Sequence, residues 1–162
     1  MKYTQGKHGR VFVVRLEDGE VLHEKLEDFA EERRIGNAVV WAIGGADKGS
    51  RLVVGPKDGI ARPIDPMENR FEDVHELSGV GTIFPNEDGK PVLHMHAACG
   101  RKGETATGCV RRGVRVWQVM EVVIQEITGV QAIREMDSSL GFELLVPRMP
   151  KMTDLSTGNQ PR

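Results

Sequence analysis

The 162-residue sequence contains no apolar run long enough to cross a bilayer, and Met1-Lys2-Tyr3 does not begin a signal peptide. It has only two cysteines, Cys99 and Cys109, and no C-x-x-C pair. We therefore expect a cytoplasmic protein that does not interact with membranes. In that compartment both cysteines are expected to be reduced.

An excess of basic residues is also lacking. The chain has 22 Lys and Arg against 24 Asp and Glu, which gives a formal net charge of −2. This balance argues against tight, unaided binding to a phosphate backbone, which needs clustered basic side chains. A Walker loop and a G-x-G-x-x-G element are absent as well, since residues 44–49, GGADKG, resemble the latter only superficially.

What the sequence does contain is a hairpin-like segment at residues 90–112, KPVLHMHAACGRKGETATGCVRR. Successive side chains of a strand point to opposite faces, so His94 and His96 share one face. If His96 lies opposite Cys109 across the hairpin, all three side chains share that face. A slip of one residue in the register would turn Cys109 to the other face and leave only the two histidines.

Two imidazoles and a thiolate are suitable ligands for zinc or another divalent transition metal. Three protein ligands leave one position for water or a substrate, unlike a closed four-ligand structural site. In the alternative interpretation, His94 and His96 pair with neighbours on a half-buried strand and Cys109 is a small core residue.

The chain as a whole predicts one amphipathic helix and a sheet of about seven strands. Residues 20–34 place Leu22, Leu26 and Phe29 at the i, i+4, i+7 spacing of a helix with one apolar face. Asp18 is a plausible N-cap for this helix. Strand-like runs occupy residues 10–16, 37–43, 51–54, 71–84, 114–127, 131–136 and 141–146, in addition to the hairpin.

This order of elements predicts an α+β fold, a mostly antiparallel sheet with one helix packed on it. Residues 1–148 are expected to form a single domain, and residues 149–162 a disordered tail. The nearly unbroken apolar run at residues 37–43 predicts a strand buried on both faces. Residues 56–70 have no periodicity and predict an irregular loop of a length that is often functional.

One helix covers little of such a sheet. We expect other copies of the chain to cover the remaining apolar strand faces, which contain Trp41, Trp117, Met120 and Val122.

Two further residues are candidates for proton transfer near a metal. Glu121 is a carboxylate within an apolar run, so it must find a partner or shift its pKa. The functional interpretation is a general base or an extra ligand, and the structural one is pairing with Arg111 or Arg112. His75 could extend the cluster of histidines and cysteine, or it could be an ordinary surface histidine.

The chain resembles the PPC domain, the module conserved in plants and prokaryotes, over residues 9–147. The similarity rests on the order and spacing of loose motifs, which are AIGGADKGSRL, HELSGVGTI, VLHMHAACGRKGETATGCV, VWQVMEVVIQEI and REMDSSLGFELL. The resemblance implies a homotrimer of α+β subunits. It also implies a metal site in some members, in which a histidine of a Gly-Gly-His motif joins the His-x-His pair. Here His94 and His96 match that pair, and Cys109 takes the third position.

In plants the resembled domain follows AT-hooks in DNA-binding nuclear proteins, and stand-alone prokaryotic members carry a DNA-binding label by association. This chain lacks the Arg-Gly-Arg-Pro core of an AT-hook. The first hypothesis is therefore a DNA-associated regulatory or assembly protein with a transition-metal site, which binds partners or a small-molecule ligand without recognising DNA itself. The alternative is a metal-dependent hydrolase or lyase that uses the open His/His/Cys site.

Overall fold

The computed structural model describes residues 1–148, which form ten strands, one α-helix and one short 3-10 helix. In chain order these are β1 (Lys7–Glu17), α1 (Leu22–Glu32), β2 (Ala38–Ala46), β3 (Arg51–Pro56), β4 (Pro66–Arg70), β5 (His75–Pro85), β6 (Pro91–Arg101), β7 (Glu104–Cys109), η1 (Val110–Arg112), β8 (Val116–Thr128), β9 (Ala132–Asp137) and β10 (Phe142–Pro147). The predicted tail at residues 149–162 lies outside the described residues.

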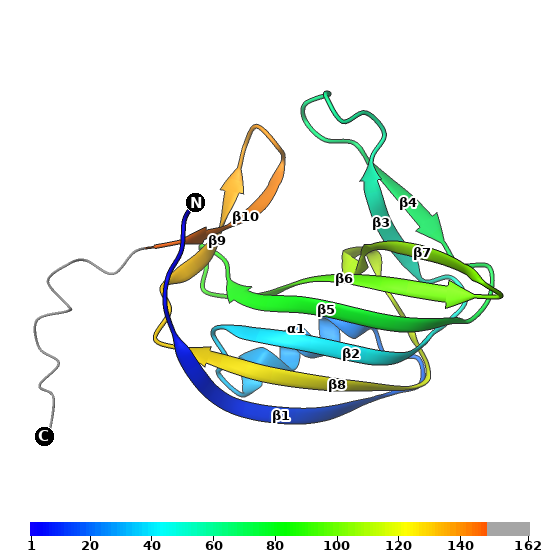
Figure 1. Ribbon diagram of the computed structural model, residues 1–162, viewed down its shortest axis with the longest axis horizontal. Helices are drawn as coiled ribbons and strands as arrows, with labels where there is room; N and C mark the ends of the chain where they lie inside the picture. The colour runs from blue at the N-terminus through cyan, green and yellow to red at the C-terminus, as the bar shows by residue number, and fades with distance from the viewer. Residues whose placement is uncertain (149–162) are drawn as a thin grey trace, which may run out of the picture.

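Eight strands form one antiparallel sheet in the order β1-β8-β2-β5-β6-β7-β3-β4, and β9 and β10 form a separate two-stranded sheet (Figure 1). The predicted α+β class with a mostly antiparallel sheet is confirmed. The main sheet has eight strands instead of about seven. The prediction of an irregular loop at residues 56–70 missed β4, which pairs with β3.

Helix α1 covers one face of the sheet, here called the inner face (Figure 1). Its buried residues are Leu22, Leu26 and Ala30, which repeat every four residues and so form one apolar stripe. The helix begins after Val21, which caps it without a side-chain hydrogen bond. Asp18 is not the N-cap, because its Oδ1 instead accepts the backbone N–H of Gln118 at 2.6 Å.

The opposite face, here called the open face, is exposed and apolar. A row of paired residues runs straight across it: Val13 lies opposite Val123, Val123 opposite Trp41, Trp41 opposite Val80, and Val80 opposite His96. Of these, Val13 is 84% exposed, Val80 57% and Trp41 41%. The apolar row therefore leads directly to the candidate metal ligands.

Two predictions about burial are wrong for a single copy of the chain. The strand at residues 37–43 is buried on its inner face only, since Trp41 and Ile43 are exposed on the open face. Met120 and Val122 are buried against the inner face, whereas Trp117 is partly exposed. Because side chains alternate along β2 and β8, each strand has one side buried in the core and one side exposed.

Two hairpins, β3–β4 and β9–β10, rise from the β6 side of the main sheet (Figure 1). Their tips approach one another, because a Cβ placed on Gly141 would lie 3.6 Å from the Cβ of Pro63. The hairpins thereby flank the part of the open face that contains His96. Among residues 1–148, no helix has the length and apolar character needed to cross a membrane.

Candidate metal centre

The hairpin of β6 and β7 has the predicted register. His96 lies opposite Cys109, and Arg101 lies opposite Glu104. Lys102 and Gly103 between them have φ values of 52° and 85°, as in the tight two-residue turns that match the twist of the two strands. This turn fixes the register, so the one-residue slip that would have turned Cys109 away does not occur.

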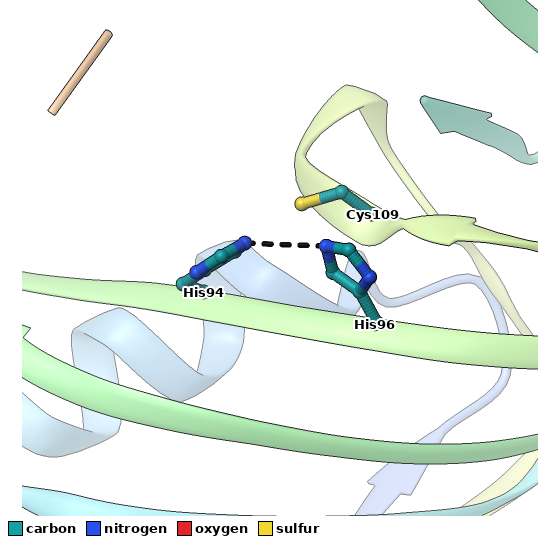
Figure 2. A group of neighbouring side chains, drawn as sticks. All are labelled: His94, His96 and Cys109. Atoms are coloured by element: carbon teal, nitrogen blue, oxygen red, sulfur yellow. Dashed lines mark hydrogen bonds between the residues drawn. The ribbon is translucent and has the colours of Figure 1, made fainter. Parts of the chain in front are cut away.

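His94, His96 and Cys109 therefore point to the same place on the open face (Figure 2). Their nearest nitrogen and sulfur atoms all lie within 4.8 Å of one another. The two Nε2 atoms are 3.3 Å apart, and the two rings meet edge to face. Two nitrogens bound tetrahedrally to one Zn²⁺ at about 2.0–2.1 Å are also about 3.3 Å apart. The separation of the two Nε2 atoms is thus that of two nitrogen ligands of one zinc ion.

The position of β6 depends on two glycines in the neighbouring strand. A Cβ on Gly81 would lie only 2.6 Å from the Cβ of Met95 and 2.8 Å from the backbone oxygen of His94. At Gly79 the nearest atom would be the flexible Met95 sulfur, at 3.2 Å. The sequence predicted a close approach at these glycines, and the approaching group is the side chain and backbone of Met95 within the core.

The surroundings keep both imidazoles neutral. Burial lowers the pKa of His94, and the guanidinium charges of Arg134 and Arg111 lower it further. Burial also lowers the pKa of His96, with additional contributions from His94 and Arg111. Neutral imidazoles are the forms that bind a metal, so no proton has to be displaced from either ring on binding.

Arg111 also acts on the third ligand. Its Nε–H donates to the sulfur of Cys109 at 3.1 Å. A cationic donor at this distance can keep its hydrogen bond to the sulfur when the cysteine binds a metal as a thiolate. Cys109 is only 3% exposed and lies at the wall of the cavity described below.

A cavity of about 390 Å³ opens at the ligands, between the two hairpins. His96, Cys109, Arg111 and Arg112 supply the polar part of its lining. Its other walls are mostly apolar and come from both hairpins and the segment between β3 and β4, with Val53, Pro56, Ile64, Pro66 and Phe142 among them. The segment at residues 56–70 therefore lines a pocket beside the candidate metal centre.

Glu121 lies away from this centre. It is on β8, three strands from β6, so its backbone and that of His96 are at least roughly 14 Å apart. It pairs across the sheet with Arg15 on one side and Ile43 on the other. The predicted partners are engaged elsewhere, since Arg112 pairs with Glu68 and Arg111 bonds to Cys109.

His75 does not extend the cluster either. It begins β5 on the same side of the strand as Leu77 and Gly79, which face the inner side of the sheet. Its ring stacks on Phe71 with centroids 4.0 Å apart, and its Nδ1 lies 2.8 Å from the carbonyl oxygen of Asp73. Within residues 1–148, only His94, His96 and Cys109 form a group that could hold a metal.

Sequence reasoning missed the two arginines of the site. Arg111 was considered only as a partner for Glu121, and Arg134 was not singled out. Arg134 is 4% exposed and reaches from β9 to the backbone of β6 and the side chain of Thr82. The sequence did offer one signal for Arg134, which is a charged residue within the apolar alternation of residues 131–136.

Comparison with known proteins identifies related chains. The family model of the Plants and Prokaryotes Conserved (PCC) domain matches residues 3–128. A metal-containing protein from Archaeoglobus fulgidus is 27% identical, with a TM-score of 0.76 over 90% of this chain and 99% of its own. A plant- and prokaryote-conserved protein from Pyrococcus horikoshii is 22% identical, with a TM-score of 0.74 over 89% of this chain and 98% of its own.

A third structure, from Bacteroides thetaiotaomicron, is named as a candidate DNA-binding protein. It is 17% identical, with a TM-score of 0.67 over 86% of this chain and 96% of its own. At this identity the similarity shows a shared fold only, as it does for the Pyrococcus protein. No curated protein matches the chain significantly.

Proposed function

The chain belongs to the Plants and Prokaryotes Conserved domain family, and we propose that it is a metal-binding member of that family. His94, His96 and Cys109 would hold a divalent transition metal, with zinc as the first candidate. The observation that carries the proposal is the convergence of these three donors from two paired strands, all within 4.8 Å. The metal-containing Archaeoglobus protein of the same fold supports it.

The chain's own residues prepare this site. The hairpin turn sets the register, partial burial and nearby guanidinium charges lower the pKa of both imidazoles, and Arg111 donates a hydrogen bond to the Cys109 sulfur. When bound, such an ion polarises an oxygen atom of whatever ligand takes its open position. In the metal-binding members that the chain resembles, a histidine takes the third position. Here Cys109 takes it, and a thiolate favours softer ions such as zinc over magnesium or calcium.

Elemental analysis of protein purified without a histidine tag or added metal tests the proposal. We expect about one transition-metal ion per chain, which is lost in Cys109→Ala. Cys99→Ala is the matched control, because Cys99 is a buried cysteine of the same hairpin that lies on the inner face. Absence of metal from the wild type and from both variants would refute the metal site.

We further propose that the protein assembles as a homotrimer through the open face. An apolar sheet face that contains Trp41, Ile43 and Val80 is costly to leave in water, and a second and third copy would cover it. Light scattering should give three times the chain mass of 17.9 kDa. Val80→Glu should reduce this mass, whereas Ile60→Glu, an equally drastic change at an exposed loop residue, should not.

A role with DNA is supported only by the names of proteins with the same fold. With a net charge of −2, we propose that any such role is indirect, through assembly or recruitment of partners. A gel shift at physiological salt should therefore show no sequence preference. A clear preference for one DNA sequence would contradict this part of the proposal.

The cavity beside the open coordination position favours a second candidate, a metal-dependent hydrolase or lyase. The test of this candidate does not depend on Glu121 or His75, the two residues that the sequence predicted for proton transfer. Any turnover found in a substrate screen should disappear in the double variant His94→Ala/His96→Ala. Retained turnover would exclude chemistry at this site.

A further inference from the structure

Arg111 stands out among the basic residues near the metal ligands. Its Nε is bonded to Cys109, but within residues 1–148 no hydrogen bond or ion pair engages its Nη1 or Nη2. By contrast, its neighbour Arg112 is paired with Glu68 at 3.2 Å. A guanidinium with two free amino groups at the end of a cavity offers a fork for a planar anion.

The other arginine of the site is already compensated. Arg134 lines a small cavity of about 130 Å³ together with Glu27 and Glu143, whose charges act on it. Arg111 lines both this small cavity and the larger one at His96. Of the two arginines that line the larger cavity, Arg111 and Arg112, only Arg111 has no carboxylate partner among residues 1–148.

The walls of the larger cavity indicate what the anion is attached to. Val53, Ile64 and Phe142 present partly buried apolar surface there, and the Phe142 ring lies 6.0 Å from the guanidinium carbon of Arg111. A volume of about 390 Å³ falls within the range of small-molecule pockets. A bare phosphate would leave these apolar walls unused, whereas an organic acid would use both ends of the cavity.

From this arrangement we infer that the protein binds a small organic carboxylate, with its carboxylate group on Arg111 at the open side of the metal centre and its apolar body against Phe142, Ile64 and Val53. This inference rests on the proposed metal site. It adds the class of the ligand and the residue that selects it. Arg111 then has two tasks, since its Nε donates to the Cys109 sulfur and its amino groups hold the ligand.

Calorimetric titration of the zinc-loaded full-length protein with benzoate tests the inference. Two comparison ligands are titrated in the same way: benzyl alcohol, which lacks the negative charge, and inorganic phosphate, which lacks the apolar body. We expect benzoate to bind more tightly than either. Arg111→Gln should weaken benzoate binding by about 10- to 100-fold, the usual loss for a charged hydrogen-bonding pair. Arg111→Lys should lose part of the affinity, because it keeps the charge without the fork.

Two measurements make the result unambiguous. Zinc content is measured in every variant, and Arg33→Gln, which removes the same charge at the distant end of α1, serves as the control. Unchanged benzoate affinity in Arg111→Gln, or equal binding of benzyl alcohol or phosphate, would overturn the carboxylate inference while leaving the metal site intact. Failure of the wild type to take up zinc would instead refute the metal site and this inference with it.

Discussion

Gly81→Ala tests how β5 and β6 place the metal ligands. The added Cβ would lie 2.6 Å from the Cβ of Met95, 2.9 Å from its Cα and 2.8 Å from the backbone oxygen of His94. Two of these three atoms belong to the backbone, so β6 itself must move. Overpacking of this kind costs about 1–3 kcal/mol, from which about 0.5–1 kcal/mol is recovered by replacing glycine in a strand.

Because the clash is with backbone, the upper end of the cost applies, and we expect Gly81→Ala to lower the free energy of unfolding by about 2 kcal/mol. With a urea m-value of about 2 kcal/mol/M, the unfolding midpoint falls by roughly 1 M. Zinc affinity should fall as well, because the displaced backbone includes that of His94. Urea unfolding followed by fluorescence, at one fixed protein concentration, measures the first effect.

Gly79→Ala is the matched control on the same strand. There the added Cβ meets the Met95 sulfur at 3.2 Å and the Ala97 Cβ at 3.3 Å, and the sulfur can move. We expect its stability to stay within about 1 kcal/mol of the wild type, with zinc affinity retained. Equal effects of the two substitutions, or a neutral Gly81→Ala, would refute the described packing of β5 on β6.

Three further predictions concern the core, an ion pair and the thiols. Leu26→Ala should lower the free energy of unfolding by about 2–5 kcal/mol, because Leu26 is fully buried beneath the sheet, and a smaller loss in urea unfolding would contradict that burial. Glu126→Gln should lower stability at neutral pH, because two side-chain hydrogen bonds and one backbone hydrogen bond from Arg10 hold the pKa of Glu126 below its usual value of 4.5. This contribution is present above pH 4.5 and is lost as the pH falls through the lowered pKa, so urea midpoints of the variant and wild type should converge in acid. In native metal-free protein, iodoacetamide should modify Cys109, which lines a cavity, and spare Cys99, whose pKa burial raises to about 12, as intact-mass and peptide analysis would show. Added zinc should block the modification of Cys109, and a reaction that zinc leaves unchanged would argue against its role as a ligand.

Local patterns in the sequence were enough to predict the ligand hairpin. Alternation put His94 and His96 on one face but left their register with Cys109 open, and the structure settles that register through the two-residue turn at Lys102 and Gly103. The helix was predictable for the same reason, since Leu22 and Leu26 repeat with its period. These features depend on residues close together in the chain.

The parts that sequence reasoning missed depend on contacts between distant segments. Strand β4, PMENR, has no apolar alternation and is a strand because it pairs with β3. The apolar run of β2 predicted burial on both faces. Composition does not tell which face the chain itself covers, and Trp41 lies on the face that it leaves exposed. Arg134 reaches the site only because the β9–β10 hairpin docks beside β5 and β6.

Cobalt titration of the metal-free protein tests the central claim most directly, because a thiolate bound to Co²⁺ gives a charge-transfer band in the near ultraviolet. We expect this band to saturate at about one Co²⁺ per chain, to be lost in Cys109→Ser and to persist in Cys99→Ser. A band that survives in Cys109→Ser, or its absence from the wild type, would contradict a metal centre built from His94, His96 and Cys109.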